Sequence, residues 1–288
     1  SFLVPYDDEC AALAVGVRTF NAPAKEFFTL RGYTLFEMGD IIAIEKSLNI
    51  KGHNSFCPCR SCEIKGVRNV TDHKKLYYVP LTQPDGRSWD PENLPLWTPE
   101  RLVAAIQKFD EISATIPDQA AAAKAKDVLA KFHGMKGLPA LRRVGSLHYP
   151  RSRPWDTMHL FFENIVPNLV KLWSGKFKGL DVGTGSYEIP ADTWDLIWEE
   201  TAAAVQHIPS DFVRVLGSTP GYYTAEAWAF WFIYLAPILL KGRFPDTKYH
   251  THLCELSDII KACLRFTSTT VQVETLWQDI IRWVRKYE

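Results

Sequence analysis

Asp156 and His159 are a carboxylate and an imidazole close enough in the sequence to take part in one reaction. They lie three residues apart where an apolar run follows Pro154, so the sequence predicts a helix that carries both on one face. A carboxylate beside an imidazole could serve a metal-dependent reaction, although an isolated Asp-x-x-His pair is a weak signal. The alternative is a first-turn charge that the helix dipole favours, next to a core histidine.

Asp40 is a second candidate, because it stands between a predicted strand and a predicted helix. The aromatic and β-branched segment from Glu26 to Phe36 is typical of a strand, and the helix is expected from Ile41 to Leu48. Open α/β folds place carboxylates that hold metals or substrates at this point. An N-cap of the helix is an equally good interpretation.

Three cysteines crowd into six residues and could bind a metal. The Cys59-x-x-Cys62 spacing is half of a zinc knuckle, and Cys57 and His53 are candidate further ligands. A second ligand pair at ordinary spacing is missing, so a reduced, thiol-rich turn is the alternative. Free thiols without a recognisable signal peptide predict an intracellular location, nuclear or cytoplasmic.

The interval from Val128 to Trp155 contains no acidic residue and is rich in Gly and Pro, which predicts a basic loop. Lys+Arg and Asp+Glu both number 33 in the whole chain, which argues against a nucleic-acid binder that works by bulk charge. A local basic patch remains compatible with that balance. The loop is either solvated or tracks phosphates into a site. Its cations are Lys131, Lys136, Arg142, Arg143, Arg151 and Arg153.

The secondary structure expected around these residues is mostly helical. With 288 residues and 47% hydrophobic residues, the chain can form one large domain or two smaller ones. Ten Trp residues predict a large helical core in the second half. Glu226 is either a catalytic acid or a first-turn charge. Helices are expected over 1–20, 99–116 and 117–132. The pattern is again helical from residue 192 onward, with helices expected over 224–240, 249–264 and 271–288. The apolar run 227–240 is too short to span a membrane and is interpreted as a buried helix.

Several motifs, spread in order over nearly the whole chain, resemble the fungal branch of the CACTA (En/Spm-like) DNA transposases. They are Phe28–Tyr33 with Gly39-Asp40-Ile41, Lys51–Asn54 with Cys57–Ile64, Tyr77–Leu81, Pro154–His159 with Glu163-Asn164, Trp173–Asp181 and Leu240–Phe244. Linked motifs in order are more specific than any one of them alone.

The resemblance implies an α+β, mostly helical protein with a partial ribonuclease-H-like core and a large helical insertion. Such a core holds two Mg²⁺ or Mn²⁺ ions on three acidic residues and cuts and joins DNA. Asp40 matches the second acid, and Asp156 with His159 matches a motif suspected of supporting DNA at the site. The implied domains are a partial core with the Cys-rich motif (1–65), an irregular linker with a helical hairpin and the basic loop (66–153), and the insertion (154–288). The implied partners are transposon ends and, in the complete protein, further copies of the chain.

The first and third acids of the family, in Asp-Gly-Phe and Glu-Arg segments, have no counterpart here. We therefore expect an internal fragment of a transposase with little or no strand-transfer activity alone. A non-catalytic helical DNA-binding or protein-interaction module derived from a transposon is the main alternative. A weaker one is an unrelated metallohydrolase that uses Asp40, Asp156 and His159.

Overall fold

The computed structural model describes residues 3–68, 77–83, 85–177, 185–213 and 216–288. The chain divides into two compact units, Ser1–Asp156 and Thr157–Glu288. The sequence predicted the last boundary three residues earlier, after residue 153, and the segments that it separated at residue 65 belong to one unit. The described residues are mostly helical and contain two sheets, each of two antiparallel strands, so the fold is α+β.

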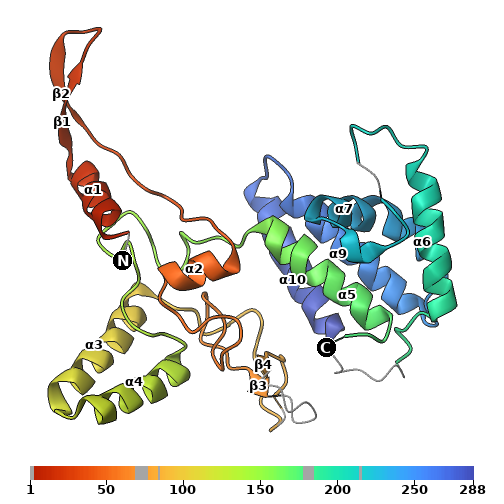
Figure 1. The fold of residues 1–288 in the computed structure, drawn as a ribbon, viewed down its shortest axis with the longest axis horizontal. Coiled ribbons are helices and arrows are strands. Elements are labelled where there is room, and N and C mark those ends of the chain that lie inside the picture. Colours follow the sequence, from red (N-terminus) through yellow and green to blue (C-terminus); the bar gives the residue numbers. More distant parts are fainter. Residues whose placement is uncertain (1–2, 69–76, 84, 178–184, 214–215) are drawn as a thin grey trace. The chain divides into compact units, whose positions relative to one another are not determined.

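The first unit begins with a helix and a hairpin (Figure 1). Helix α1 (Val4–Val15) ends at Gly16, whose φ of 125° suits a residue without a side chain. Strand β1 (Val17–Asn21) then pairs in register with β2 (Glu26–Leu30). The prediction of a helix to residue 20 was therefore wrong at its end.

The predicted strand from Glu26 to Phe36 is shorter than expected. Pairing ends at Leu30, and residues 31–40 run without regular secondary structure to helix α2 (Ile41–Ser47). All five residues of β2 are exposed. Within the described residues, the hairpin therefore packs against no further sheet. Residues 31–36 have the composition of a strand but pair with no other strand there.

A helical hairpin completes the first unit after the short strands β3 (Val67–Arg68) and β4 (Tyr77–Tyr78). Helix α3 (Pro99–Thr115) begins with Thr98 as N-cap, because its side chain accepts from the Arg101 amide. Helix α4 (Gln119–His133) ends at Gly134, whose φ is 71°. The Thr98 cap before Pro99 and the Gly134 that ends α4 can both be recognised in the sequence. Both helices lie within two residues of their predicted bounds.

The second unit is helical throughout its regular structure. Its elements are η1 (Met158–Ile165), α5 (Val166–Trp173), α6 (Ala191–Val205), η2 (Pro220–Tyr222), α7 (Ala225–Phe230), η3 (Trp231–Leu235), α8 (Ala236–Leu239), α9 (Thr247–Cys263) and α10 (Thr270–Tyr287). Helices α7, η3 and α8 follow one another without a break and form the helix predicted over 224–240. Part of the sequence motif Trp173–Asp181 lies outside the described residues.

Two segments of the second unit are π-helical, and each precedes a proline. The amide of Val166 bonds to the Phe161 carbonyl before Pro167, and that of Ala236 bonds to the Trp231 carbonyl before Pro237. Proline has no amide to donate and its ring crowds the carbonyl four residues earlier. The hydrogen-bond ladder therefore widens by one residue ahead of each proline rather than breaking.

The core of the second unit is large and rich in tryptophan, as the sequence predicted. Trp231 is fully buried, and its indole nitrogen donates to the Thr201 hydroxyl over 3.1 Å. Trp228 is also buried, whereas Tyr234 on the same continuous helix is 59% exposed. No helix among the described residues is both long enough and apolar enough to cross a membrane.

Candidate nucleic-acid interface and thiol turn

Asp40 caps helix α2. Its side-chain oxygen accepts the Ala43 amide over 2.6 Å, and the side chain lies exposed. This is the N-cap interpretation of the sequence, in which the carboxylate satisfies an amide that the helix leaves open. Among the described residues, no group of three or more His, Cys, Asp or Glu side chains could hold a metal ion. A metal-binding role for Asp40 stays a prediction.

Cys59 and Cys62 form a close thiol pair in a turn. The Ser61 amide donates to the Cys59 sulfur over 3.3 Å. The hydrogen bond from the Cys62 thiol, together with the backbone amides of Ser61 and Cys62, lowers the pKa of Cys59 to about 6, although burial opposes the shift. The same hydrogen bond and burial raise the pKa of Cys62. Cys59 is therefore the nucleophilic member of the pair.

The other two predicted zinc ligands face elsewhere. The Cys57 thiol donates to the Phe132 carbonyl over 3.0 Å, and burial raises its pKa to about 11. One ring nitrogen of His53 lies 2.9 Å from Glu45, and the other lies 2.8 Å from the Asn54 amide. The four predicted ligands thus do not fit a tetrahedral zinc site as they stand. Zinc binding remains a prediction from the sequence.

Arg60, inside the thiol turn, was not singled out from the sequence. It is 3% exposed, donates to the Pro154 carbonyl over 2.7 Å, and places its guanidinium 3.9 Å from the centre of the Trp155 ring. A buried, stacked arginine is a fixed structural link. It ties the thiol turn to the end of the basic loop, just before Asp156. The only hint in the sequence is an arginine between closely spaced cysteines.

The basic loop holds the first unit together. The Ala140 amide donates to the Ser47 carbonyl over 2.7 Å, and the Glu37 amide donates to the Ser152 carbonyl over 2.9 Å. The Ser146 hydroxyl donates to the Thr34 carbonyl over 2.7 Å. Two backbone atoms and one hydroxyl of the loop therefore fasten α2 and the extended segment that precedes it. A loop anchored in this way presents its side chains from fixed positions.

Three of the six cations that the sequence assigns to the basic loop are occupied by carboxylates, and one of the three, Lys131, lies in helix α4 rather than in the loop. Lys131 pairs with Asp127, and Arg153 is buried against Glu37 at 2.7 Å. Arg143 binds the buried Asp7 through its Nε and backbone amide.

The other three cations of the loop, Lys136, Arg142 and Arg151, are exposed and have no ion-pair partner in the described part of the chain. Contact of these three cations with phosphates stays a prediction.

The Asp156 and His159 pair spans the boundary between the units. Asp156 ends the first unit and precedes the helix, while His159 lies in the first turn of η1 with its Nε2 3.7 Å from Glu163. A functional role for this pair stays a prediction. Glu226 stands in the first turn of α7, the position that the helix dipole favours for an acid.

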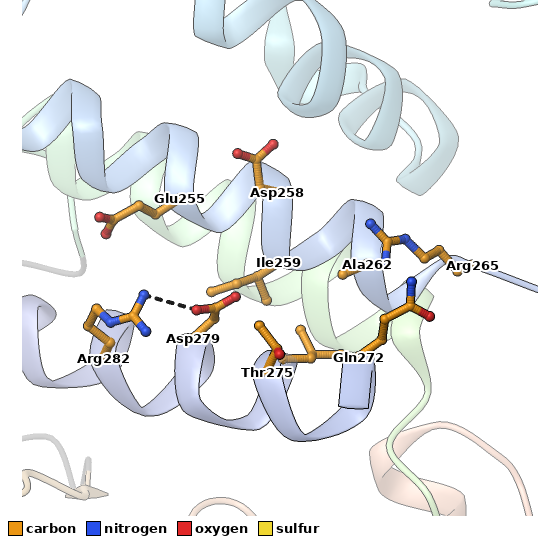
Figure 2. A pocket seen from close by; sticks show the side chains of 10 residues that line it. Glu255, Asp258, Ile259, Ala262, Arg265, Gln272, Thr275, Asp279 and Arg282 are labelled. Carbon is orange, nitrogen blue, oxygen red and sulfur yellow. Dashed lines mark hydrogen bonds and ion pairs between the residues drawn. The ribbon is translucent and has the colours of Figure 1, made fainter. Parts of the chain in front are cut away.

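A groove of about 330 Å³ runs between α9 and α10 (Figure 2). Its acids are matched by bases: Asp279 pairs with Arg282 at 2.9 Å, Asp258 with Lys261 at 3.2 Å, and Glu255 with Lys286. Carboxylates that are already paired offer little to a cationic ligand. We assign no site to it.

No family model, curated protein or solved structure matches the chain.

Proposed function

We propose that this chain is part of a cut-and-paste DNA transposase of the CACTA type and that it contributes DNA contact rather than a complete active centre. The order of the motifs along the chain supports the family, and the free cations of the basic loop support the contact. Lys136, Arg142 and Arg151 carry the proposal, because they are exposed, without ion-pair partners among the described residues, and mounted on an anchored loop.

A ribonuclease-H-like centre needs more than Asp40. When bound, a pair of divalent cations activates water or a DNA 3′-hydroxyl and stabilises the leaving oxygen. Two cations require several carboxylates, and Asp40 is the one acid that the family motif places in this chain. The proposed role of the chain is therefore to hold DNA beside carboxylates that other sequence supplies.

DNA contact is tested by fluorescence anisotropy with a labelled 20-base-pair duplex at increasing salt. Each phosphate contact contributes a slope of about −0.9 in log K against log salt. The triple variant Lys136→Ala, Arg142→Ala, Arg151→Ala is expected to flatten the slope by up to about 2.7 and to weaken binding at low salt. The control removes Arg87, Lys261 and Arg282, which pair with acids elsewhere, and should bind as the parent does. Equal slopes for all three proteins would refute the proposal.

Catalysis is tested on the same duplex with Mg²⁺ or Mn²⁺. We expect no cleavage by the purified chain. Asp40→Asn is the decisive variant, because asparagine keeps the helix cap and removes the charge that binds metal. Robust cleavage by the parent chain that Asp40→Asn abolishes would show a complete metal centre and overturn this part of the proposal.

The second candidate function is a non-catalytic DNA-binding or protein-interaction module derived from a transposon. The capping role of Asp40 favours it, because the carboxylate already has a structural use. Mg²⁺ distinguishes the two functions. Tighter duplex binding with Mg²⁺ that Asp40→Asn abolishes favours the transposase centre, whereas no effect of the ion favours the module.

A further inference from the structure

A cavity of about 360 Å³ opens in the second unit between α5, α6, η2 and α7. Aromatic rings form much of its wall, contributed by Trp194, Trp198, Tyr223 and Trp228. The sequence predicted these tryptophans as core, and they are largely buried, but the same rings also border the cavity. Its size lies within the range of small-ligand sites.

The aromatic wall is held in a fixed geometry. Trp194 stacks on Trp198 with centroids 5.2 Å apart and an angle of 19°, and its indole nitrogen donates to the Trp173 carbonyl over 3.3 Å. Tyr223 stands at 83° to Trp198 and donates its hydroxyl to the Gly217 carbonyl over 2.7 Å. Rings fixed by neighbours and hydrogen bonds lose little freedom when a flat ligand packs against them.

Two lysines make the lining basic. Lys171 and Lys176 are exposed, and neither has an ion-pair partner among the residues that the structure describes. Asp195 is the one acid of the lining. The cavity thus combines flat apolar faces with cations that lack a counter-ion.

We propose that this cavity binds an unstacked nucleotide of single-stranded DNA, with its base against the aromatic wall and its phosphates at Lys171 and Lys176. Stacking on aromatic side chains and backbone contact by cations are the two components of single-strand binding. The choice of DNA as the ligand rests on the proposed function. The cavity, however, lies in the second unit and would bind single-stranded DNA, whereas the basic loop lies in the first unit and is tested with duplex DNA.

The test is the anisotropy of a fluorescein-labelled decathymidylate titrated with the full chain at 50 mM salt. The double variant Lys171→Ala, Lys176→Ala is expected to bind at least tenfold more weakly and to flatten the salt slope by about 1.4, at roughly 0.7 for each single-strand phosphate contact. Lys241→Ala with Lys261→Ala is the matched control in the same unit and should stay within twofold of the parent. Equal loss in both double variants would overturn the proposal.

The role of the base is tested separately. An abasic decamer with the same phosphates should bind at least fivefold more weakly than decathymidylate. Tyr223→Leu should lose this preference, whereas Tyr223→Phe, which keeps the ring and loses the hydroxyl bond to Gly217, should retain it. Circular dichroism confirms that each variant folds. Equal binding of the abasic strand, or binding of a proline-rich peptide in place of DNA, would contradict the proposal.

The two proposals fail independently. Loss of duplex binding in the triple variant of the basic loop tests the proposed function and leaves Lys171 and Lys176 intact. Decathymidylate binding that survives in that triple variant, and is lost in the lysine pair variant, assigns the single strand to the cavity. If only duplex binding is observed, the cavity proposal is wrong and the proposed function stands.

Discussion

The two units of this protein are stabilised by different interactions. The second unit packs one continuous apolar cluster around Trp231, Phe232 and Ile260. Among its described residues, the first has two smaller clusters, one around Ile44 and Met135 and one around Cys10, and the basic loop joins its elements. Exposed hydrogen bonds and ion pairs fix the positions of the groups that they join, but each adds little to the free energy of folding. Buried apolar area adds more. A loop that both joins elements and displays cations suits contact with DNA.

The largest effect should come from the core of the second unit. Trp231→Ala removes a fully buried indole and its hydrogen bond to Thr201 and should lower the free energy of unfolding by about 3–5 kcal/mol. Urea unfolding followed by circular dichroism measures the loss. Tyr234→Ala on the same helix removes a ring that is 59% exposed and should cost about 0.5 kcal/mol or less. Equal losses would mean that the apolar cluster is not what stabilises this unit.

The next effect tests the polar links of the first unit. Arg153→Ala leaves Glu37 without its buried partner and should cost about 3 kcal/mol, because an unpaired charge in a dry site is unfavourable. The double variant Arg153→Met, Glu37→Leu should recover most of this loss, since two apolar side chains can replace a buried ion pair. Urea unfolding at low and high salt provides the measurement. A loss that vanishes at high salt would indicate a pair open to solvent.

A smaller effect is expected at the helix cap. Asp40→Ala removes the acceptor of the Ala43 amide and should lower stability by about 1 kcal/mol, whereas Asp40→Asn should be nearly neutral. Thermal unfolding of the two variants and the parent chain measures the loss of stability. A large loss in Asp40→Asn would mean that the negative charge has a structural use beyond the cap.

The thiol turn should change reactivity with little effect on stability. Because the thiolate is the reactive form, alkylation of Cys59 by iodoacetamide should reach half its maximal rate near pH 6, whereas Cys57 stays protonated until about pH 11. Peptide mass spectrometry after timed labelling follows each thiol. Cys62→Ala removes the main cause of the low pKa, so the half-point of Cys59 should rise. A half-point that stays near pH 6 in that variant would show that the backbone amides alone stabilise the thiolate.

Zn²⁺ extends this experiment to the zinc prediction. Protection of Cys57, Cys59, Cys62 and His53 together would show that the four predicted ligands can converge around the ion. Protection of Cys59 and Cys62 without Cys57 would limit binding to the pair that the turn already brings together.

Most of the helices could be predicted from local sequence patterns. Thr98 with Pro99, and Gly134, mark helix ends through local geometry, and the apolar periodicity after residue 154 indicates a helical second half. The clustering of cations between Val128 and Trp155 was equally visible. These signals are local, because a cap or a turn depends on residues within one helical turn.

Which charged side chains form ion pairs and which strands pair with one another depends on the tertiary structure. Arg153 and Lys136 look alike in the sequence, yet one is buried against Glu37 and the other is exposed. The segment from 31 to 36 has the composition of a strand but finds no neighbouring strand in the described residues. The tryptophans around Trp198 border a cavity only because α5, α6 and α7 bring them to it. Pairing, burial and cavities depend on residues far apart in the chain, which local sequence patterns do not encode.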